Sequence, residues 1–239
     1  MKERGRVALT VAYAVYAAAY AFLRIRDDFL WAGWLNLAVQ AALDLLTAAV
    51  AFKLARRSTG VMRTFLSLVG WASCFGIVSD ASYGYTINVR GVNPNSLDGV
   101  SLVYQIAYAL FLGAWALAWA WTAWANLKVR RPAAGWSIAA LVGLLALGAV
   151  FWSVYLPLLR ASPLSPAAQA FHELFTAAQL LGIVAGLLTL MAGFDRIYGL
   201  SFLGFALFVG VDFFLRTQEI SSSLPRCIPW SLCGLSGRS

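Results

Sequence analysis

Seven long, continuously apolar runs dominate this sequence and constrain its fold more than any other feature. A helix needs about 20 apolar residues to cross the roughly 30 Å hydrocarbon core of a bilayer. Strands of membrane barrels alternate apolar and polar residues, and these runs show no such alternation. The sequence therefore predicts an all-α, polytopic membrane helix bundle with seven transmembrane helices. We expect them at residues 7–23, 30–52, 64–87, 100–126, 134–159, 167–192 and 199–215.

The composition agrees with this prediction and leaves little room for a soluble domain. Hydrophobic residues make up 61% of the 239 positions and charged residues only 12%, whereas soluble proteins average about 25% charged residues. We expect residues 1–216 to form one transmembrane domain and residues 217–239 a short irregular tail that is flexible or truncated. The basic start followed by an apolar run also has the look of a signal peptide, but six further spans favour an uncleaved first helix.

The basic residues predict the orientation, because Lys and Arg in short loops resist translocation. Eleven of the 18 basic residues fall on one side of the predicted spans. We therefore expect an integral protein of the bacterial inner membrane with a cytoplasmic N-terminus and a tail on the opposite side. Topology and anionic lipid account for the net charge of +8. The lipid bilayer is the expected partner, and no nucleic acid is expected.

Four acidic residues lie within or at the margin of the apolar runs and are the main functional candidates. They are Asp44, Asp80, Glu173 and Asp212. A charge in hydrocarbon costs about 2.5–3.5 kcal/mol, so each acid needs a partner, a proton or a water-filled cavity. The last three lie towards the outer side, where His172 precedes Glu173, and Arg216 could pair with Asp212 one turn away. Each acid could also serve only as interhelical packing.

The second predicted helix carries a polar stripe. Asn36, Gln40 and Asp44 are spaced i, i+4, i+8, which places them on one helix face. Because polar side chains in membrane helices face the protein interior or a cavity, we expect this stripe to face the interior of the bundle.

The sequence predicts no cofactor and no metal site. The single histidine has no good ligands clustered beside it, and the three cysteines match neither a zinc nor a redox spacing. Seven helices suggest a retinal protein, but retinal needs a lysine in the last helix. The three lysines are Lys2, Lys53 and Lys128.

The segment from Asp80 to Tyr108 is the most distinctive part of the chain. It carries G-x-x-S-D-x-x-Y at the end of the third span and N-P-N-S-x-D-x-x-x-L-x-Y-x-x-x-Y across the next connection. This pattern resembles the membrane sensor regions, of seven to eight spans, at the N-termini of bacterial diguanylate cyclases and sensor histidine kinases. The later helices are similar to that family's closing pair, where an acid ends an apolar run as Asp212 does. The resemblance covers roughly residues 70–212.

The resemblance implies a sensory input module that detects a periplasmic, lipidic or membrane-state signal. The family continues into cytoplasmic output domains, whereas this sequence ends soon after the seventh span. We therefore expect either a receptor that acts through a signalling output protein or as a homo-oligomer, or a truncated or frame-shifted remnant. The ligand-binding candidates are Asp80, Tyr83, Ser96, Asp98, Tyr104, Tyr108, His172, Glu173 and Asp212.

Two other classes of protein stay open. Small integral-membrane enzymes such as terpene cyclases have similar length and helix number, and buried acids could protonate an alkene or epoxide. They too end with an acid in an apolar run such as ALFVGVD. The Trp-Glu pair that those enzymes place in an early helix is absent, so Asp44 would have to replace it. The other class is a structural partner subunit.

Overall fold

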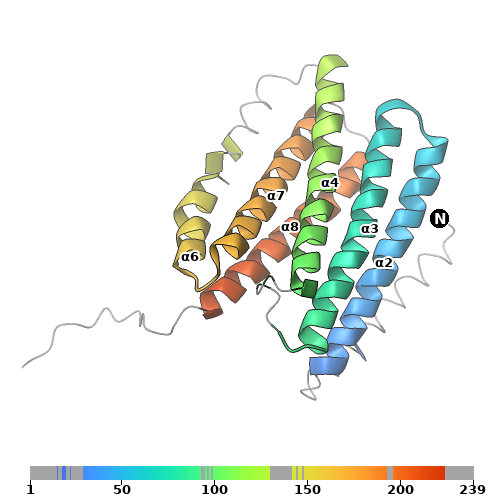
Figure 1. Ribbon diagram of the computed structural model, residues 1–239. Helices are drawn as coiled ribbons and strands as arrows, with labels where there is room; N and C mark the ends of the chain where they lie inside the picture. The colour runs from blue at the N-terminus through green and yellow to red at the C-terminus, as the bar shows by residue number, and fades with distance from the viewer. Residues whose placement is uncertain are drawn as a thin grey trace, which may run out of the picture. The chain divides into compact units, whose positions relative to one another are not determined.

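The computed structural model describes residues 15, 18, 19, 22, 29–92, 95, 97, 99–129, 142, 143, 145, 146, 148–192 and 196–223. The regular structure in these ranges is helical throughout, without a strand. The helices are α2 (Phe29–Arg57), α3 (Gly60–Asn88), α4 (Gly99–Val129), the π-helical turn η2 (Phe151–Tyr155), α6 (Leu156–Ala161), α7 (Pro166–Ala192) and α8 (Arg196–Ser223) (Figure 1).

Five of these helices are long and apolar enough to cross a bilayer: α2, α3, α4, α7 and α8. The structure therefore confirms an all-α integral membrane bundle. Each of the five contains one predicted span and extends past it at one or both ends, because 27 to 31 residues are more than the hydrocarbon core requires. The predicted span at 7–23 lies almost wholly outside the described residues, and the span at 134–159 lies partly outside them.

The described end of the span predicted at 134–159 is not a continuous α-helix. Residues 151–155 form the π-helical turn η2, and α6 follows with Pro157 in its first turn. Proline lacks the amide hydrogen that would complete the α-helical pattern, and single π-helical turns commonly accommodate such a break. Tyr155, the last residue of η2, is fully buried next to this break.

The chain divides into two compact units, unit 1 (Met1–Thr122) and unit 2 (Ala123–Ser239). In unit 1, α2 and α3 form an antiparallel pair joined by the two residues Ser58 and Thr59 (Figure 1). Glycines set how closely the two helices approach. A Cβ atom placed on Gly70 would lie 2.7 Å from the Phe52 ring, and one placed on Gly84 would lie 2.5 Å from Leu37. Large side chains of α2 thus fill the gaps at glycines of α3.

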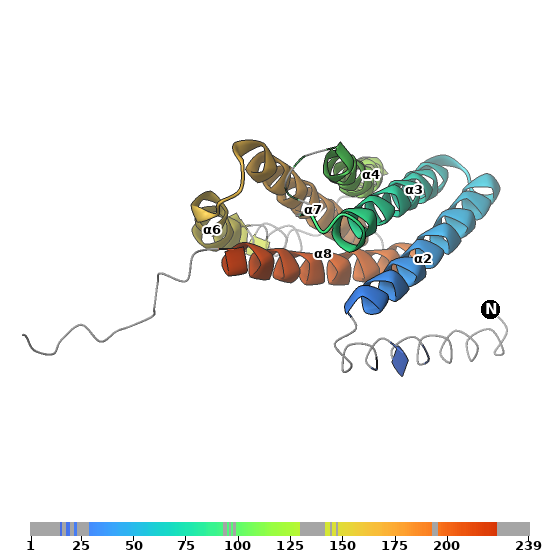
Figure 2. The same ribbon diagram turned by 60° about the horizontal axis from the view of Figure 1, so that its bottom comes forward.

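The opposite side of α3 packs against α4, as Figure 2 also shows. The ring centroids of Phe65 and Trp119 are 4.9 Å apart near one end of the pair, and those of Tyr83 and Tyr104 are 5.1 Å apart near the other. Phe65 and Trp119 are fully buried. Helix α3 is therefore the central helix of unit 1, with α2 and the first part of α4 as its neighbours.

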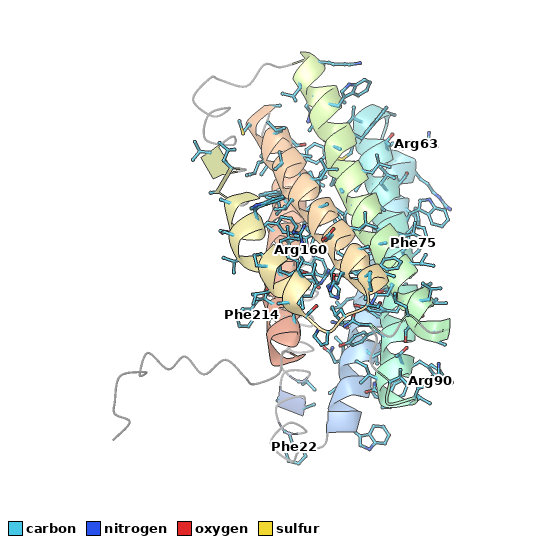
Figure 3. All side chains as sticks on the ribbon, turned by 60° about the vertical axis from the view of Figure 1, so that its left-hand side comes forward. Phe22, Arg63, Phe75, Arg90, Arg160 and Phe214 are labelled. Atoms are coloured by element: carbon cyan, nitrogen blue, oxygen red, sulfur yellow. The ribbon has the colours of Figure 1, made fainter. Side chains whose placement is uncertain are left out.

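Arginines mark both ends of α3. Figure 3 shows Arg63 near the start of the helix and Arg90 just beyond its end, with Phe75 between them. Helix α3 has 29 residues, which at about 1.5 Å per residue is long enough to place both arginines outside the hydrocarbon core. This arrangement fits a helix that crosses the membrane completely.

In unit 2, α6 contacts both α7 and α8 (Figure 2). Tyr155, Leu159 and Ile220 form a buried cluster with Phe213 packed against it. Ile220 lies beyond the tail boundary predicted at residue 217, and its burial against α6 explains why α8 continues to Ser223. Residues 224–239 lie outside the described part of the chain.

Candidate functional site

Asp44 of α2 lies where three described helices of unit 1 meet. A Cβ atom placed on Gly76 of α3 would lie 2.8 Å from Oδ2 of Asp44 and 3.4 Å from the ring of Phe111 on α4. A larger residue at position 76 would require the Asp44 side chain to shift. Asp44 is half-buried, so the sequence places an acid against the backbone of the central helix.

Asp80 lies one turn after Gly76 on the same face of α3 and is also half-buried. It acts electrostatically on Asp44 across the α2–α3 contact. Neither carboxylate forms a hydrogen bond or an ion pair with another described residue. A charged carboxylate at this depth in a bilayer is costly. A proton, a cation or a hydrogen-bond donor at this junction would therefore stabilise the structure.

A row of aromatic side chains connects this junction to the end of α3. Tyr83 contacts Tyr104 with ring centroids 5.1 Å apart, Tyr104 contacts Tyr108 at 5.9 Å, and Tyr108 contacts Phe111 at 5.8 Å. Phe111 in turn borders Gly76 and thus Asp44. The structure thus brings together three tyrosines that the sequence selected, and it links them through Phe111 to the position of Asp44.

The connection before α4 folds back on that helix. The side chain of Gln105 donates a hydrogen bond from Nε2 to Oδ1 of Asn95 over 3.1 Å, and both residues are buried. Leu97 has a positive φ of 57°, which is a strained conformation for a residue with a branched side chain. Ser96 and Asp98, predicted to bind a ligand, lie outside the described residues.

The polar stripe predicted on α2 is interior at only part of its length. Asp44 packs against α3 and Asn36 is half-buried, but Gln40 is exposed. An α-helix has 3.6 residues per turn, so each step of four residues rotates the stripe by about 40° around the helix. The three residues therefore spread over about 80° of α2 with Gln40 in the middle, so this rotation does not account for the exposure of Gln40.

In unit 2, Asp212 has two donors on one oxygen. Arg216 forms the predicted ion pair one turn along α8, with NH2 2.6 Å from Oδ2 of Asp212. Gln179 of α7 donates from Nε2 to the same Oδ2 over 2.6 Å. The guanidinium carbon of Arg216 also lies 4.6 Å from the centre of the Phe175 ring, a cation–π contact. The acid in unit 2 is therefore neutralised and tied to the neighbouring helix.

His172 lies on the same face of α7, seven residues before Gln179, and is buried. Its Nδ1 lies 3.5 Å from the hydroxyl oxygen of Tyr155. Glu173 is exposed and has no interaction with these residues. Of the candidates in unit 2, His172 and Asp212 thus belong to one buried polar cluster, while Glu173 lies outside it.

Sequence reasoning missed Tyr155 and Gln179, and it noted Gly76 only as the first residue of the G-x-x-S-D-x-x-Y pattern, without a role in packing. A signal for Gln179 existed, because His172, Thr176 and Gln179 form one polar line on an otherwise apolar helix. Tyr155 and Gly76 gave no such signal. Their roles depend on which side chain of another helix they meet.

Five long apolar helices and buried polar groups define an integral membrane helix bundle. No protein-family model, no curated protein and no solved structure matches this chain. The resemblance to membrane sensor regions thus rests on the residues quoted for it. Four of these, Asp80, Tyr83, Tyr104 and Tyr108, lie along α3 and α4 of unit 1.

Proposed function

We propose that this chain is an integral membrane sensory module that responds to a periplasmic, lipidic or membrane-state signal. The observation that carries the proposal is the unbroken packing from Tyr83, near the end of α3, through Tyr104, Tyr108 and Phe111 to the place where Asp44 packs against α3. A signal that moves one end of this row has a physical route to the α2–α3 contact.

The acids give that contact two alternative packings. With its glycines at positions 70, 76 and 84, α3 fits α2 closely, and the half-buried carboxyl groups of Asp44 and Asp80 oppose this fit when they are charged. A ligand or a change in lipid packing that displaces Tyr104 shifts Phe111 and thereby alters the space around Asp44. A signal needs only a modest difference in affinity for the two packings to change their populations.

The proposed topology has seven spans, a cytoplasmic N-terminus and a tail on the opposite side. The five described helices supply five of the spans, and the regions of 7–23 and 134–159 supply the other two. A reporter enzyme fused after Ser223 should be active outside the cytoplasm, and one fused after Arg57 should be active inside it. The opposite result would overturn the orientation. The signal then passes to a separate signalling output protein or through a homo-oligomer.

A pair of tyrosine variants tests the sensory role. Tyr83 contacts Tyr104, whereas Tyr85, two residues later and similarly exposed (39% and 44%), has no ring contact among the described residues. Tyr83→Ala should alter a cytoplasmic signalling readout, such as the level of a cyclic dinucleotide or of a phosphorylated response regulator, in cells that carry the variant. Tyr85→Ala should leave the readout unchanged. Equal effects of the two variants would contradict the proposal.

The facing carboxylates also favour a second function, a membrane enzyme that protonates an alkene or epoxide. This reading makes a different prediction for the same cells. Asp44→Asn and Asp80→Asn would each abolish a cyclic isoprenoid product in lipid extracts analysed by mass spectrometry, and the signalling readout would not change. An unchanged lipid profile in both variants would exclude this enzyme.

A further inference from the structure

The α2–α3 end of unit 1 carries four cations without an acidic partner: Lys53, Arg56, Arg57 and Arg63. All four are exposed, and none forms an ion pair with a described residue. The sequence has no acidic residue between Asp44 and Asp80. Along α2, Asp44 lies about 13 Å from Lys53, at 1.5 Å per residue. Among the described residues of unit 1 no carboxylate pairs with this cluster, so an anion from another molecule can serve as its counter-charge.

Two of the cations continue an apolar line on α2. Leu46, Val50, Lys53 and Arg57 are spaced i, i+4, i+7, i+11 and share one helix face. Leu46 and Val50 are 56% and 47% exposed. The opposite face, with Ala48, Ala51 and Ala55, is buried. The line thus lies on the side of α2 that faces away from α3 and is open to lipid.

The order of residues on this line matches one class of molecule. Leu46 lies about 10 Å deeper along the helix than Lys53, so the apolar end lies within a leaflet of about 15 Å and the cations lie at its surface. Like charges at i and i+4 repel each other, and one phosphate group can accept hydrogen bonds from both. We infer that Leu46, Val50, Lys53 and Arg57 form a binding site for an anionic phospholipid, with the acyl chain along Leu46 and Val50 and the phosphate between Lys53 and Arg57.

Binding at this site differs from a general attraction of basic residues to the membrane. Two double variants that remove the same charge from different positions distinguish these possibilities. Lys53→Gln with Arg57→Gln removes both phosphate contacts. Arg56→Gln with Arg63→Gln removes the same charge from positions off the line. Phosphatidylglycerol and phosphatidylcholine retained by the purified full chain would be counted by native mass spectrometry, with helicity by circular dichroism as the control for folding.

We expect the native chain to retain phosphatidylglycerol in preference to phosphatidylcholine. One hydrogen bond contributes about fivefold in affinity, so the Lys53/Arg57 double variant, which loses both phosphate contacts, should bind phosphatidylglycerol roughly 30-fold more weakly. The Arg56/Arg63 variant should bind it almost as the native chain does. If the first double variant does not fold, Lys53→Gln alone should lose about fivefold.

Three results would overturn this inference. Equal losses in the two double variants would mean that the attraction depends only on net charge. Equal retention of the two lipids by the native chain would mean that the phosphate is not recognised as an anion. Displacement of bound phosphatidylglycerol by inorganic phosphate at millimolar concentration would assign the site to a free anion rather than to a lipid.

Discussion

The acids of the two units have opposite surroundings. In unit 2, Asp212 receives a guanidinium and an amide donor, each 2.6 Å from the same oxygen. In unit 1, Asp44 lies against α3 at Gly76, and neither Asp44 nor Asp80 has a cation or hydrogen-bond donor as partner among the described residues. One acid is held by partners, and the other two lie half-buried without such partners in the described part of the chain. The arrangement in unit 2 is typical of packing between helices. In unit 1, a signal can change the free energy of the α2–α3 contact.

The largest effect that tests this contrast is expected from Arg216→Met. The change leaves Asp212 partly buried without its cation, and breaking a buried ion pair costs about 3–5 kcal/mol. Thermal unfolding of the purified chain in detergent measures the loss. Arg160→Met, at an exposed arginine of α6, is the control and should unfold almost as the native chain does. Adding Asp212→Asn to Arg216→Met should restore part of the stability. Equal midpoints for the two single variants would contradict the structural role of the pair.

The next effect is expected from Gly76→Ala. The added methyl group would lie 2.8 Å from the Asp44 carboxylate, and overpacking of this kind costs about 1–3 kcal/mol. At Gly113 of α4 no described atom lies within 4 Å of an added Cβ, so Gly113→Ala should leave stability unchanged or raise it by up to about 1 kcal/mol. Asp44→Ala should rescue Gly76→Ala. Similar tolerance of alanine at both glycines would show that Asp44 does not pack against α3 at this point.

A smaller effect is expected from Gln179→Leu. Its amide joins α7 to Asp212 of α8, and hydrogen bonds between membrane helices contribute about 0.6 kcal/mol on average and at most about 1.7 kcal/mol. In a chain that already carries Arg216→Met and Asp212→Asn, the same change should cost measurably less. Additive losses would mean that Gln179 and Asp212 do not act on each other.

Much of the fold follows from the sequence, because the length of an apolar run directly fixes whether a helix can cross a bilayer. The Asp212–Arg216 pair was predictable for a similar reason, since residues four apart on a helix are neighbours. The Asp44–Asp80 contact was not. It depends on the register of α2 against α3, which is set where Leu37 and Phe52 meet Gly84 and Gly70. A local pattern contains no information on which residue of another helix a glycine will face.

The polar stripe on α2 shows a second limit. Spacing alone grouped Asn36, Gln40 and Asp44, but Gln40 is exposed while Asp44 packs against α3. The length of α8 shows a third limit. The apolar run ends near residue 215, yet burial of Ile220 against α6 extends α8 to Ser223. Contacts between elements decided both outcomes.

The central claim is that the acids of unit 1 respond to a signal while the acid of unit 2 holds the structure together. The most direct test measures the signalling readout per molecule of membrane protein for Asp80→Asn and Asp212→Asn side by side. We expect Asp80→Asn to change the readout at an unchanged protein level, and Asp212→Asn to lower the protein level at an unchanged readout per molecule. A changed readout for Asp212→Asn, with none for Asp80→Asn, would contradict the claim.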